Sequence, residues 1–327
     1  MRHLLGLAAM LPMLWAATAQ SSPETCAYIP QAKARLNCFD TYFTPAELPK
    51  ISADGELGLL SEALPKLSLI EARIEQEATL TDQWFSITPH HPNYILPLTF
   101  SDSPDYCRNE PLNDSFSDYE IKMQLSLKTR LAQGLWRDSS VWAAYTQQSY
   151  WQLYAEDDAS APFRETNHQP EIFWQVPTDF EVFGWNARVA TLALNHQSNG
   201  RSEPLSRSWN RVTAELALDR GNWVISAKTW SRISEPADID DNPNIEDYMG
   251  RLQLGLIHKR ERHTIAVALK NNLSSPNRSG PEVNYTFPLF SRLKGFVQIY
   301  SGYGEDLIDM ENYNNRIGIG IALTDWL

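Results

Sequence analysis

The chain has 327 residues, of which 43% are hydrophobic and 21% are charged, so its composition excludes a disordered tail and a bundle of membrane helices. Its mean hydropathy is −0.39, and no apolar run after the first twenty residues approaches the roughly 18 that a membrane helix requires. The formal net charge of −12 and the pI of about 5.1 argue against nucleic acid as a partner, because phosphate binding needs clustered Lys and Arg.

The first residues have the pattern of a secretory signal. A charged start at Arg2 precedes an apolar run from Leu4 to Ala16, and Ala17-Thr18-Ala19 supplies a small-x-small cleavage site. The run is too short to span a bilayer as a helix. We therefore expect residues 1–19 to be a signal peptide.

Residues 20–75 differ in composition from the rest of the chain. They contain five prolines, a short helical pattern at Leu57–Leu64, and two of the three cysteines, Cys26 and Cys38. We interpret this segment as an N-terminal periplasmic extension of a domain that spans residues 76–327. An exported protein meets an oxidising compartment, where a Cys26–Cys38 disulfide can form. Three unpaired thiols are the alternative, and we weigh the two interpretations equally.

From about Asn93 onward, apolar and polar residues alternate with the two-residue period of a β-strand. The clearest runs are residues 121–128, 251–256, 264–270, 296–300 and 316–324. Turn signals such as Arg220-Gly221-Asn222 separate them. This pattern fits either a soluble β-sandwich or barrel, or an outer-membrane barrel whose apolar side chains face lipid.

Three features favour the membrane barrel. The polar face suits a hydrated lumen better than a packed core, and the chain ends on an apolar-aromatic strand. Tryptophans near strand ends are typical of interfacial girdles. The polar residues are Lys122, Gln124, Lys128, Arg211, Glu215 and Arg251, and the tryptophans are Trp142, Trp151, Trp174, Trp185, Trp209 and Trp230. We therefore expect an all-β transmembrane antiparallel β-barrel.

One hairpin carries the parts of a nucleophilic hydrolase. By strand parity, His196 and Ser198 project from the same face as Leu194, and Asn210 shares the face of Val212, so all three polar side chains would face lipid. Polar groups there cost free energy unless they bond one another. A serine attacks, a histidine takes its proton, and a third group orients the imidazole. A neutral asparagine suits the third role in a poorly solvating environment.

The alternative is a polar hairpin end above the membrane, with His196 merely hydrogen-bonded. The protein would then be a passive pore or transporter, or a receptor or adhesin whose loops bind a partner. No Gly-x-Ser-x-Gly, His-Glu-x-x-His or P-loop motif occurs. Residues 238–242 superficially resemble a calcium loop, but Pro243 and Met249 occupy the positions where an EF-hand needs Gly and Glu. We interpret those residues as an acidic surface loop.

The segments Asn195–Ser202 and Ser206–Arg211 resemble the signature of bacterial outer-membrane phospholipase A. Further similar segments are Pro162–Asn167, Asp240–Pro243, Tyr248–Gly250 and Tyr300–Glu305, so the resemblance runs from about residue 75 to the end. It implies a twelve-stranded barrel in the outer membrane of a Gram-negative bacterium. It also implies hydrolysis of acyl esters of phospholipids and lysophospholipids by a calcium-dependent homodimer.

The resemblance assigns catalytic roles to the hairpin. Ser198 would be the nucleophile, His196 the base and Asn210 the orienting residue. The backbone N–H of Gly200 would contribute to the oxyanion hole, helped by calcium-bound water.

The resemblance also implies calcium ligands and a dimer contact. The Arg201 carbonyl and the Ser206 hydroxyl of one subunit would bind calcium together with the carbonyl of Ser160 of the partner subunit. Gln147 would lie near a buried polar contact at the dimer interface. Glu203 stands where the family can use Asp in a monomer calcium site, so its longer side chain is a departure from the family pattern.

Overall fold

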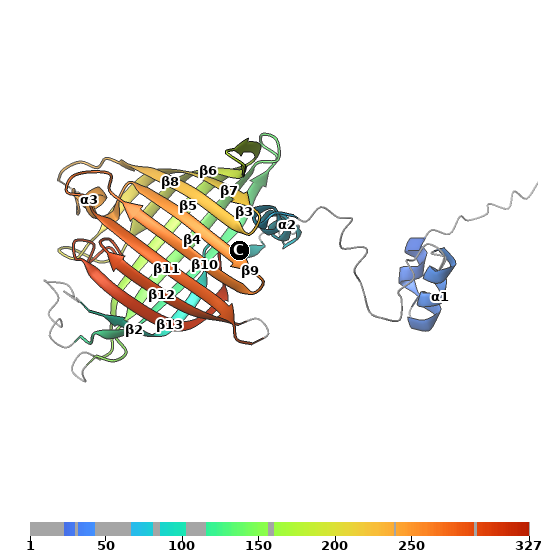
Figure 1. Cartoon of the computed structure of the whole chain (residues 1–327), viewed down its shortest axis with the longest axis horizontal. Coiled ribbons are helices and arrows are strands. Elements are labelled where there is room, and N and C mark those ends of the chain that lie inside the picture. The colour runs from blue at the N-terminus through green and yellow to red at the C-terminus, as the bar shows by residue number, and fades with distance from the viewer. Residues whose placement is uncertain are drawn as a thin grey trace, which may run out of the picture. The chain divides into compact units, whose positions relative to one another are not determined.

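The computed structural model describes residues 23–29, 32–42, 67–80, 86–102, 116–155, 160–238, 240–290 and 293–326 (Figure 1). The chain divides into two compact units, one ending at Pro65 and the other beginning at Lys66. The predicted signal peptide and the helical pattern at 57–64 lie outside the described residues.

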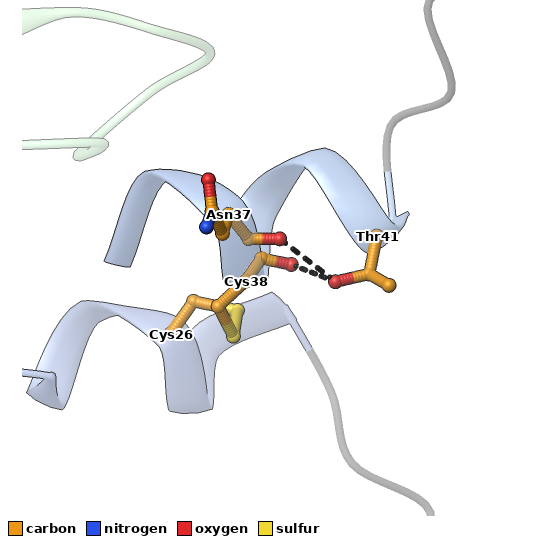
Figure 2. The surroundings of a disulfide bond; sticks show 4 residues. All are labelled: Cys26, Asn37, Cys38 and Thr41. Carbon is orange, nitrogen blue, oxygen red and sulfur yellow. Dashed lines mark hydrogen bonds between the residues drawn. A yellow bond between two sulfur atoms is a disulfide. The ribbon is translucent and has the colours of Figure 1, made fainter. Parts of the chain in front are cut away.

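The first unit contains a disulfide-linked pair of short helices. The 3-10 helix η1 (Pro23–Tyr28) and helix α1 (Ala32–Tyr42) are joined by a bond between Cys26 and Cys38 (Figure 2). The Thr41 hydroxyl donates to the carbonyl of Cys38 at 2.8 Å and satisfies one free carbonyl of the last helical turn. Of the two interpretations of these cysteines, the disulfide is the one present. A segment this small has little core of its own, so the covalent link holds it together.

The second unit is a closed barrel of twelve antiparallel strands, β2 to β13, among the described residues, with the short strand β1 added beside β3. The strands are β1 (Ile87–Pro89), β2 (Asn93–Ser101), β3 (Tyr119–Gln133), β4 (Ser140–Trp151), β5 (Phe163–Val182), β6 (Trp185–Ser198), β7 (Ser208–Arg220), β8 (Trp223–Ile233), β9 (Leu252–Arg260), β10 (His263–Asn271), β11 (Ser279–Pro288), β12 (Lys294–Gly302) and β13 (Asn314–Thr324). The pairing of β13 with β2 closes the sheet, so no open edge remains to be covered in lipid. In the described part of the chain, no helix is long and apolar enough to cross a membrane.

The predicted alternation is confirmed along the barrel wall. On β3, Leu125 is 49% exposed, whereas the neighbouring Lys122 and Ser126 are fully buried in the interior. Large apolar side chains cover the outer wall on all sides. They include Leu98, Leu125, Ile172, Leu192, Leu194, Val212, Leu254, Ile265, Val283, Ile299, Ile317 and Ile319. This apolar outer band identifies a transmembrane barrel, and the alternative of a soluble sandwich is wrong.

Three of the tryptophans expected at the membrane interfaces lie inside the barrel instead. Trp142, Trp209 and Trp230 are all buried. The Trp209 indole N–H donates to Gln197 at 3.0 Å, and the Arg211 guanidinium lies 4.0 Å from the ring centroid. The reason is parity, because Trp209 is two residues from the inward-facing Arg211. These rings fill the lumen and do not form a girdle.

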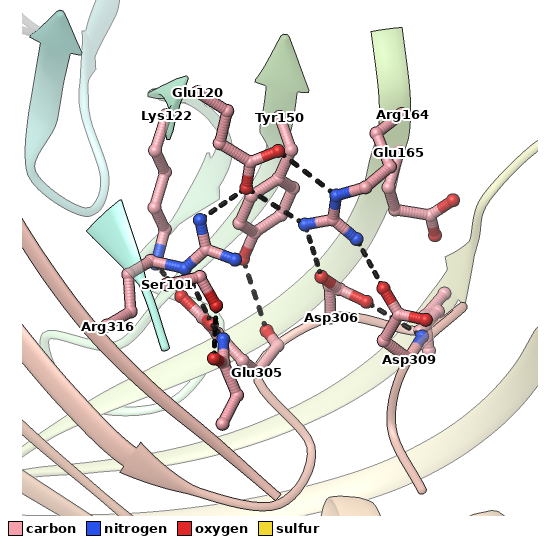
Figure 3. Close-up of polar contacts among 12 residues, drawn as sticks. Ser101, Glu120, Lys122, Tyr150, Arg164, Glu165, Glu305, Asp306, Asp309 and Arg316 are labelled. Atoms are coloured by element: carbon pink, nitrogen blue, oxygen red, sulfur yellow. Dashed lines mark hydrogen bonds and ion pairs between the residues drawn. The ribbon is translucent and has the colours of Figure 1, made fainter. Parts of the chain in front are cut away.

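At one end of the barrel interior, buried ion pairs join the wall strands to one another and to the 303–313 loop (Figure 3). Glu120 accepts from Arg164 at 3.0 Å and also contacts Arg316. Glu305 accepts from Lys122 and from Arg316, each at 2.9 Å. Burial opposes ionisation of Glu305, but Arg316 and Lys122 hold its pKa well below its usual range. The interior charges expected in a hydrated lumen are therefore paired with one another at this end, as buried charges require.

The other end of the barrel carries helix α2 (Leu69–Leu80). Glu77 accepts from Lys128 at 2.8 Å, Arg73 donates to the carbonyl of Pro89 at 2.9 Å, and the Ile70 N–H donates to Asp219 at 3.3 Å. The helix belongs to the barrel unit, whereas we expected the extension to continue to residue 75.

The lengths of the connections between strands indicate which end of the barrel faces the periplasm. The turns near α2 are short (183–184, 221–222 and 261–262), and the connections at the opposite end are longer (199–207, 234–251 and 303–313). Short turns face the periplasm in outer-membrane barrels. Helix α2 therefore lies at the periplasmic end, and the β6–β7 connection at the external end.

Candidate active site

His196, Ser198 and Asn210 lie on the outer wall of the barrel, as their parity predicts. In the register of β6 and β7, His196 is directly opposite Asn210. All three side chains are half-buried, whereas the intervening Asn195 and Gln197 are buried in the interior. The three polar groups thus share a surface with apolar, lipid-facing side chains.

His196 and Asn210 are hydrogen-bonded, and a glutamate fixes the direction of that bond. The Nδ1 of His196 lies 2.9 Å from the Oδ1 of Asn210, and the Nδ2 of Asn210 donates to the Oε1 of Glu235 at 2.9 Å. An ionised carboxylate only accepts hydrogen bonds, so the amide nitrogen must face Glu235 and the amide oxygen must face the imidazole. Nδ1 therefore carries the proton, and Nε2 keeps a free lone pair. Glu235 was not predicted from the sequence.

Ser198 is the next outward-facing residue beyond His196 on β6. Among the contacts of the described residues, no hydrogen bond joins its hydroxyl to His196. Catalytic hydrogen bonds are often long without substrate and tighten when it binds. The structure thus places the serine on the same face as the imidazole but joins only the histidine and the asparagine.

Gly200 and His168 form the other side of this surface. Gly200 follows β6 with φ at +66°, a left-handed conformation that glycine adopts at little cost. Its backbone N–H has no acceptor among the described residues. His168 of β5 pairs in register with Ser198, and its ring lies 3.7 Å from the place a Cβ on Gly200 would occupy. Ser198 therefore has an imidazole on its neighbouring strand as well as on its own.

Gln147 belongs to a hydrogen-bonded polar cluster on the outer wall. It accepts from the Tyr145 hydroxyl and donates to Ser149, each at 3.1 Å, and Thr166 donates to Ser149 at 3.2 Å. The Tyr145 hydroxyl also lies 2.6 Å from the Nδ1 of His168. Polar groups on a lipid-facing wall are expensive and mark a functional surface by default.

The loop between β6 and β7 is organised by the buried side chain of Asn199. Its Oδ1 accepts from the backbone N–H groups of Arg201 at 3.3 Å and Arg207 at 3.0 Å, and its Nδ2 donates to the Leu205 carbonyl at 2.8 Å. The amide of one side chain thus forms hydrogen bonds with three backbone groups of a loop that has no regular secondary structure. The sequence motif contains Asn199, but its inward parity alone does not reveal this role.

Oxygen ligands suited to calcium gather where this loop meets the connection between β8 and β9. The Ser206 hydroxyl donates to Asp241 at 2.5 Å, and a side-chain hydrogen bond to Asp241 raises the pKa of Glu203. A hydroxyl and two carboxylates fit calcium, which prefers oxygen ligands and has flexible geometry. Two carboxyl groups held together also favour either a shared proton or a cation. The 238–242 segment is therefore more than the acidic surface loop we expected, because Asp241 joins this group.

Ser160 lies elsewhere, in the connection between β4 and β5. It is exposed, and both it and Ala161 have positive φ, at +52° and +47°. Among the contacts of the described residues, none joins Ser160 to Arg201 or Ser206. The carbonyl assigned to calcium by resemblance therefore comes from a different connection of the barrel than Arg201 and Ser206.

A closed barrel with an apolar outer band, and with a serine, a histidine and an amide on that band, defines the class of outer-membrane β-barrel hydrolases. Residues 70–323 match the family model of phospholipase A1. The chain belongs to the phospholipase A1 family, whose members are ester hydrolases, and it is a β-barrel of the Gram-negative outer membrane.

Individual relatives agree with this assignment. Phospholipase A1 of Proteus vulgaris is 38% identical over 247 residues, which cover 75% of this chain and 83% of the relative. The solved outer membrane phospholipase A of Escherichia coli is similar with a TM-score of 0.70 and 34% identity, over 75% of this chain and 95% of that one. A solved variant of that protein is an active-site mutant in which an asparagine is replaced by alanine.

The Salmonella typhi outer membrane phospholipase has been solved as a dimer with bound calcium. It is similar with a TM-score of 0.70 and 35% identity, over 76% of this chain and 96% of that one.

Proposed function

We propose that this protein hydrolyses acyl esters of phospholipids and lysophospholipids with Ser198 as nucleophile, His196 as base and Asn210 as orienting residue. The observation that carries the proposal is the 2.9 Å contact between His196 Nδ1 and Asn210 Oδ1 on the lipid-facing wall, beside Ser198. The asparagine in the active site of the Escherichia coli relative supports the third assignment.

The reaction is an acyl transfer in two halves. The Ser198 hydroxyl attacks the ester carbonyl carbon and gives its proton to the Nε2 of His196. The Gly200 N–H donates to the oxyanion, and the loss of one such donor costs about 3–4 kcal/mol in other hydrolases. The ester C–O bond then breaks, and His196 returns the proton to the departing lysophospholipid oxygen. In the second half, His196 takes a proton from water as the water oxygen attacks the acyl-serine carbonyl carbon. The bond between the acyl group and the Ser198 oxygen then breaks, His196 returns the proton to that oxygen, and the fatty acid leaves.

Asn210 and Glu235 act on this chemistry only through His196. Asn210 accepts from Nδ1 throughout, so the imidazole cannot turn when it becomes charged. Glu235 holds the amide so that its oxygen, and not its nitrogen, faces the ring. These two residues maintain the tautomer that allows Nε2 to accept a proton.

Calcium is the cofactor we propose, because the ligands fit it and the Salmonella typhi relative binds it. The Arg201 carbonyl, the Ser206 hydroxyl and the carbonyl of Ser160 of the partner subunit would hold one ion. Glu203 and Asp241 would hold a second, on the monomer. When bound beside Gly200, calcium supplies positive charge that favours the oxyanion.

Dimerisation is the control point in this proposal. Gln147 lies in a polar cluster on the outer wall, where hydrogen bonds to a second copy would be made in lipid. A calcium site shared between subunits would then be complete only in the homodimer.

The test is fatty-acid release from phosphatidylcholine in mixed micelles with calcium by the purified full-length chain. We expect Ser198→Ala to abolish release. The matched control is Ser231→Ala on β8, an exposed serine opposite Val212 in register, which should leave the rate unchanged. Undiminished hydrolysis by Ser198→Ala would rule out the nucleophile assignment. A passive pore, the alternative function, would instead show ion conductance without hydrolysis. The paired charges and side chains that fill the lumen argue against such a pore.

A further inference from the structure

We propose that His90, His91 and Glu171 form a binding site for a divalent transition-metal ion such as Zn²⁺ inside the barrel. One ligand atom from each of the three residues lies within 4.8 Å of the others. The two imidazole rings have centroids 4.0 Å apart, and the Nε2 of His90 lies 2.8 Å from the Oε1 of Glu171. Two imidazole nitrogens and a carboxylate oxygen form a donor set that zinc accepts, with a fourth position left open.

The surrounding residues hold these ligands in place. His90 stacks on Phe173 with centroids 5.2 Å apart. The second carboxylate oxygen of Glu171 accepts from Asn195 at 3.3 Å, and Asn195 in turn accepts from Arg211 at 3.1 Å. Such second contacts orient metal ligands and strengthen binding. They leave the Oε1 of Glu171 as the oxygen directed at the histidines.

His91 is the ligand whose structural role is otherwise unexplained. Its imidazole makes no hydrogen bond within the described part of the chain, although its ring lies 5.7 Å from that of Trp326. The side chain lines a lumen cavity of about 350 Å³. An imidazole that faces a cavity without a protein partner keeps a lone pair for an ion, and the cavity gives the ion and its water a route in.

The charge around the cluster permits a cation. Lys128, Lys228 and Arg211 are the nearby bases. Lys128 is paired with Glu77 at 2.8 Å, and Lys228 lies directly opposite Glu215 in the β7–β8 register. The Arg211 guanidinium donates to Asn195 at 2.6 Å and to Gln197 at 3.2 Å. Glu171 therefore retains a negative charge that can offset part of the charge of a divalent ion. Calcium is a poor candidate here, because it takes oxygen ligands. The site is thus chemically separate from the calcium ligands of the external loop.

The ion would join two distant parts of the chain. His90 and His91 lie between β1 and β2, and Glu171 is in the wall strand β5, 81 residues further along. Because binding occurs only when both parts are in place, its free energy adds to the stability of the folded barrel. The proposed role is therefore to fasten the entry segment of the barrel to its wall.

The test uses the full-length protein in detergent micelles after chelation and removal of the chelator. We expect one equivalent of Zn²⁺ to bind by calorimetry and to raise the thermal unfolding temperature, and Co²⁺ to give the visible absorption of a nitrogen-oxygen site. His91→Ala, which breaks no hydrogen bond among the described residues, and Glu171→Gln should each weaken zinc binding about tenfold or more. His263→Ala is the matched control, because His263 is exposed on β10 and its ring hydrogen-bonds to Tyr285, so this variant should bind zinc like the unmutated chain.

Two results would overturn the proposal. One is a zinc affinity that neither His91→Ala nor Glu171→Gln changes, with both variants showing the circular dichroism of the folded barrel. The other is the absence of stoichiometric binding by the unmutated chain at micromolar zinc. Ser198→Ala should bind zinc normally, and excess Ca²⁺ should not displace it, so the result does not depend on the proposed hydrolysis.

Discussion

The amide nitrogen of Asn210 donates to the carboxylate of Glu235 at 2.9 Å, and this contact decides which nitrogen of His196 carries the proton. Glu235 lies two residues after the end of β8, so the orienting group comes from a third strand end, outside the β6–β7 hairpin. In the proposed mechanism, the relay would run from serine through histidine and asparagine to glutamate, with the charge placed furthest from the reacting ester.

Glu235→Gln should lower kcat with little change in KM. A glutamine amide can donate as well as accept, so it no longer forces the Asn210 oxygen toward the imidazole. The loss of a charge-assisted hydrogen bond of about 1.5 kcal/mol corresponds to a rate about tenfold lower. Steady-state kinetics on phosphatidylcholine micelles would show it, with the exposed Glu181→Gln on β5 as control.

The same contact predicts a rescue. Asn210→Asp alone would place two carboxylates side by side, and their repulsion would favour a shared proton in place of an ordered imidazole. Asn210→Asp combined with Glu235→Gln removes the repulsion and should be several-fold more active than Asn210→Asp alone. If the double variant is no more active than that single variant, Glu235 does not act through Asn210.

Calcium affinity should rise with pH through the range in which Glu203 ionises. The hydrogen bond to Asp241 raises the pKa of Glu203, so this carboxyl keeps its proton above the ordinary glutamate value of about 4.3. Calcium must displace that proton, and it therefore binds more weakly on the acid side. Calorimetric titration at about pH 5 and pH 8 should show the difference, and Glu203→Gln should reduce it. An identical pH dependence in Glu203→Gln would contradict this role.

Gln147→Ala should weaken dimerisation in detergent with calcium. Hydrogen bonds between membrane segments contribute about 1 kcal/mol, so the dimer dissociation constant should rise about fivefold. Sedimentation equilibrium measures it, and Tyr285→Phe on the outer face of β11 provides a control away from the polar cluster. An unchanged monomer–dimer equilibrium would remove Gln147 from the interface.

Glu305→Gln should destabilise the barrel by about 3 kcal/mol at neutral pH, because it leaves Lys122 and Arg316 buried without their shared carboxylate. The folded-state pKa of Glu305 is lowered, so its contribution is present above the unfolded value of about 4.3 and is lost as the pH falls through the folded value. The free energies of unfolding of the unmutated protein and of Glu305→Gln, measured with urea, should therefore differ less in acid than at pH 7. The exposed Glu311→Gln is the control.

The outward placement of His196 and Ser198 could be predicted because strand parity is local. Two residues along a strand return to the same face, whatever the rest of the chain does. The same rule places Trp209 in the lumen, since it has the parity of Arg211. A tryptophan near a strand end is typical of a girdle, but the position along the strand decides which face the side chain takes.

Contacts set by pairs of distant segments could not be obtained in this way. Glu235 and Asp241 reach the site from the connection after β8, and His168 reaches it through the register of β5 against β6. Neither loop path nor register can be read from one segment alone. Helix α2 was missed for a related reason: its attachment rests on charge pairs such as Glu77 with Lys128, and not on a strong apolar stripe.

Ser198 faces the membrane and not the lumen, so in the proposed mechanism the relevant substrate concentration is that of phospholipid within the membrane. Molecules that reach the serine arrive by diffusion in two dimensions, along the plane of the lipid. The rate should then follow the mole fraction of phospholipid around the barrel, and diluting that surface with inert detergent should slow the reaction even when the bulk phospholipid concentration is constant.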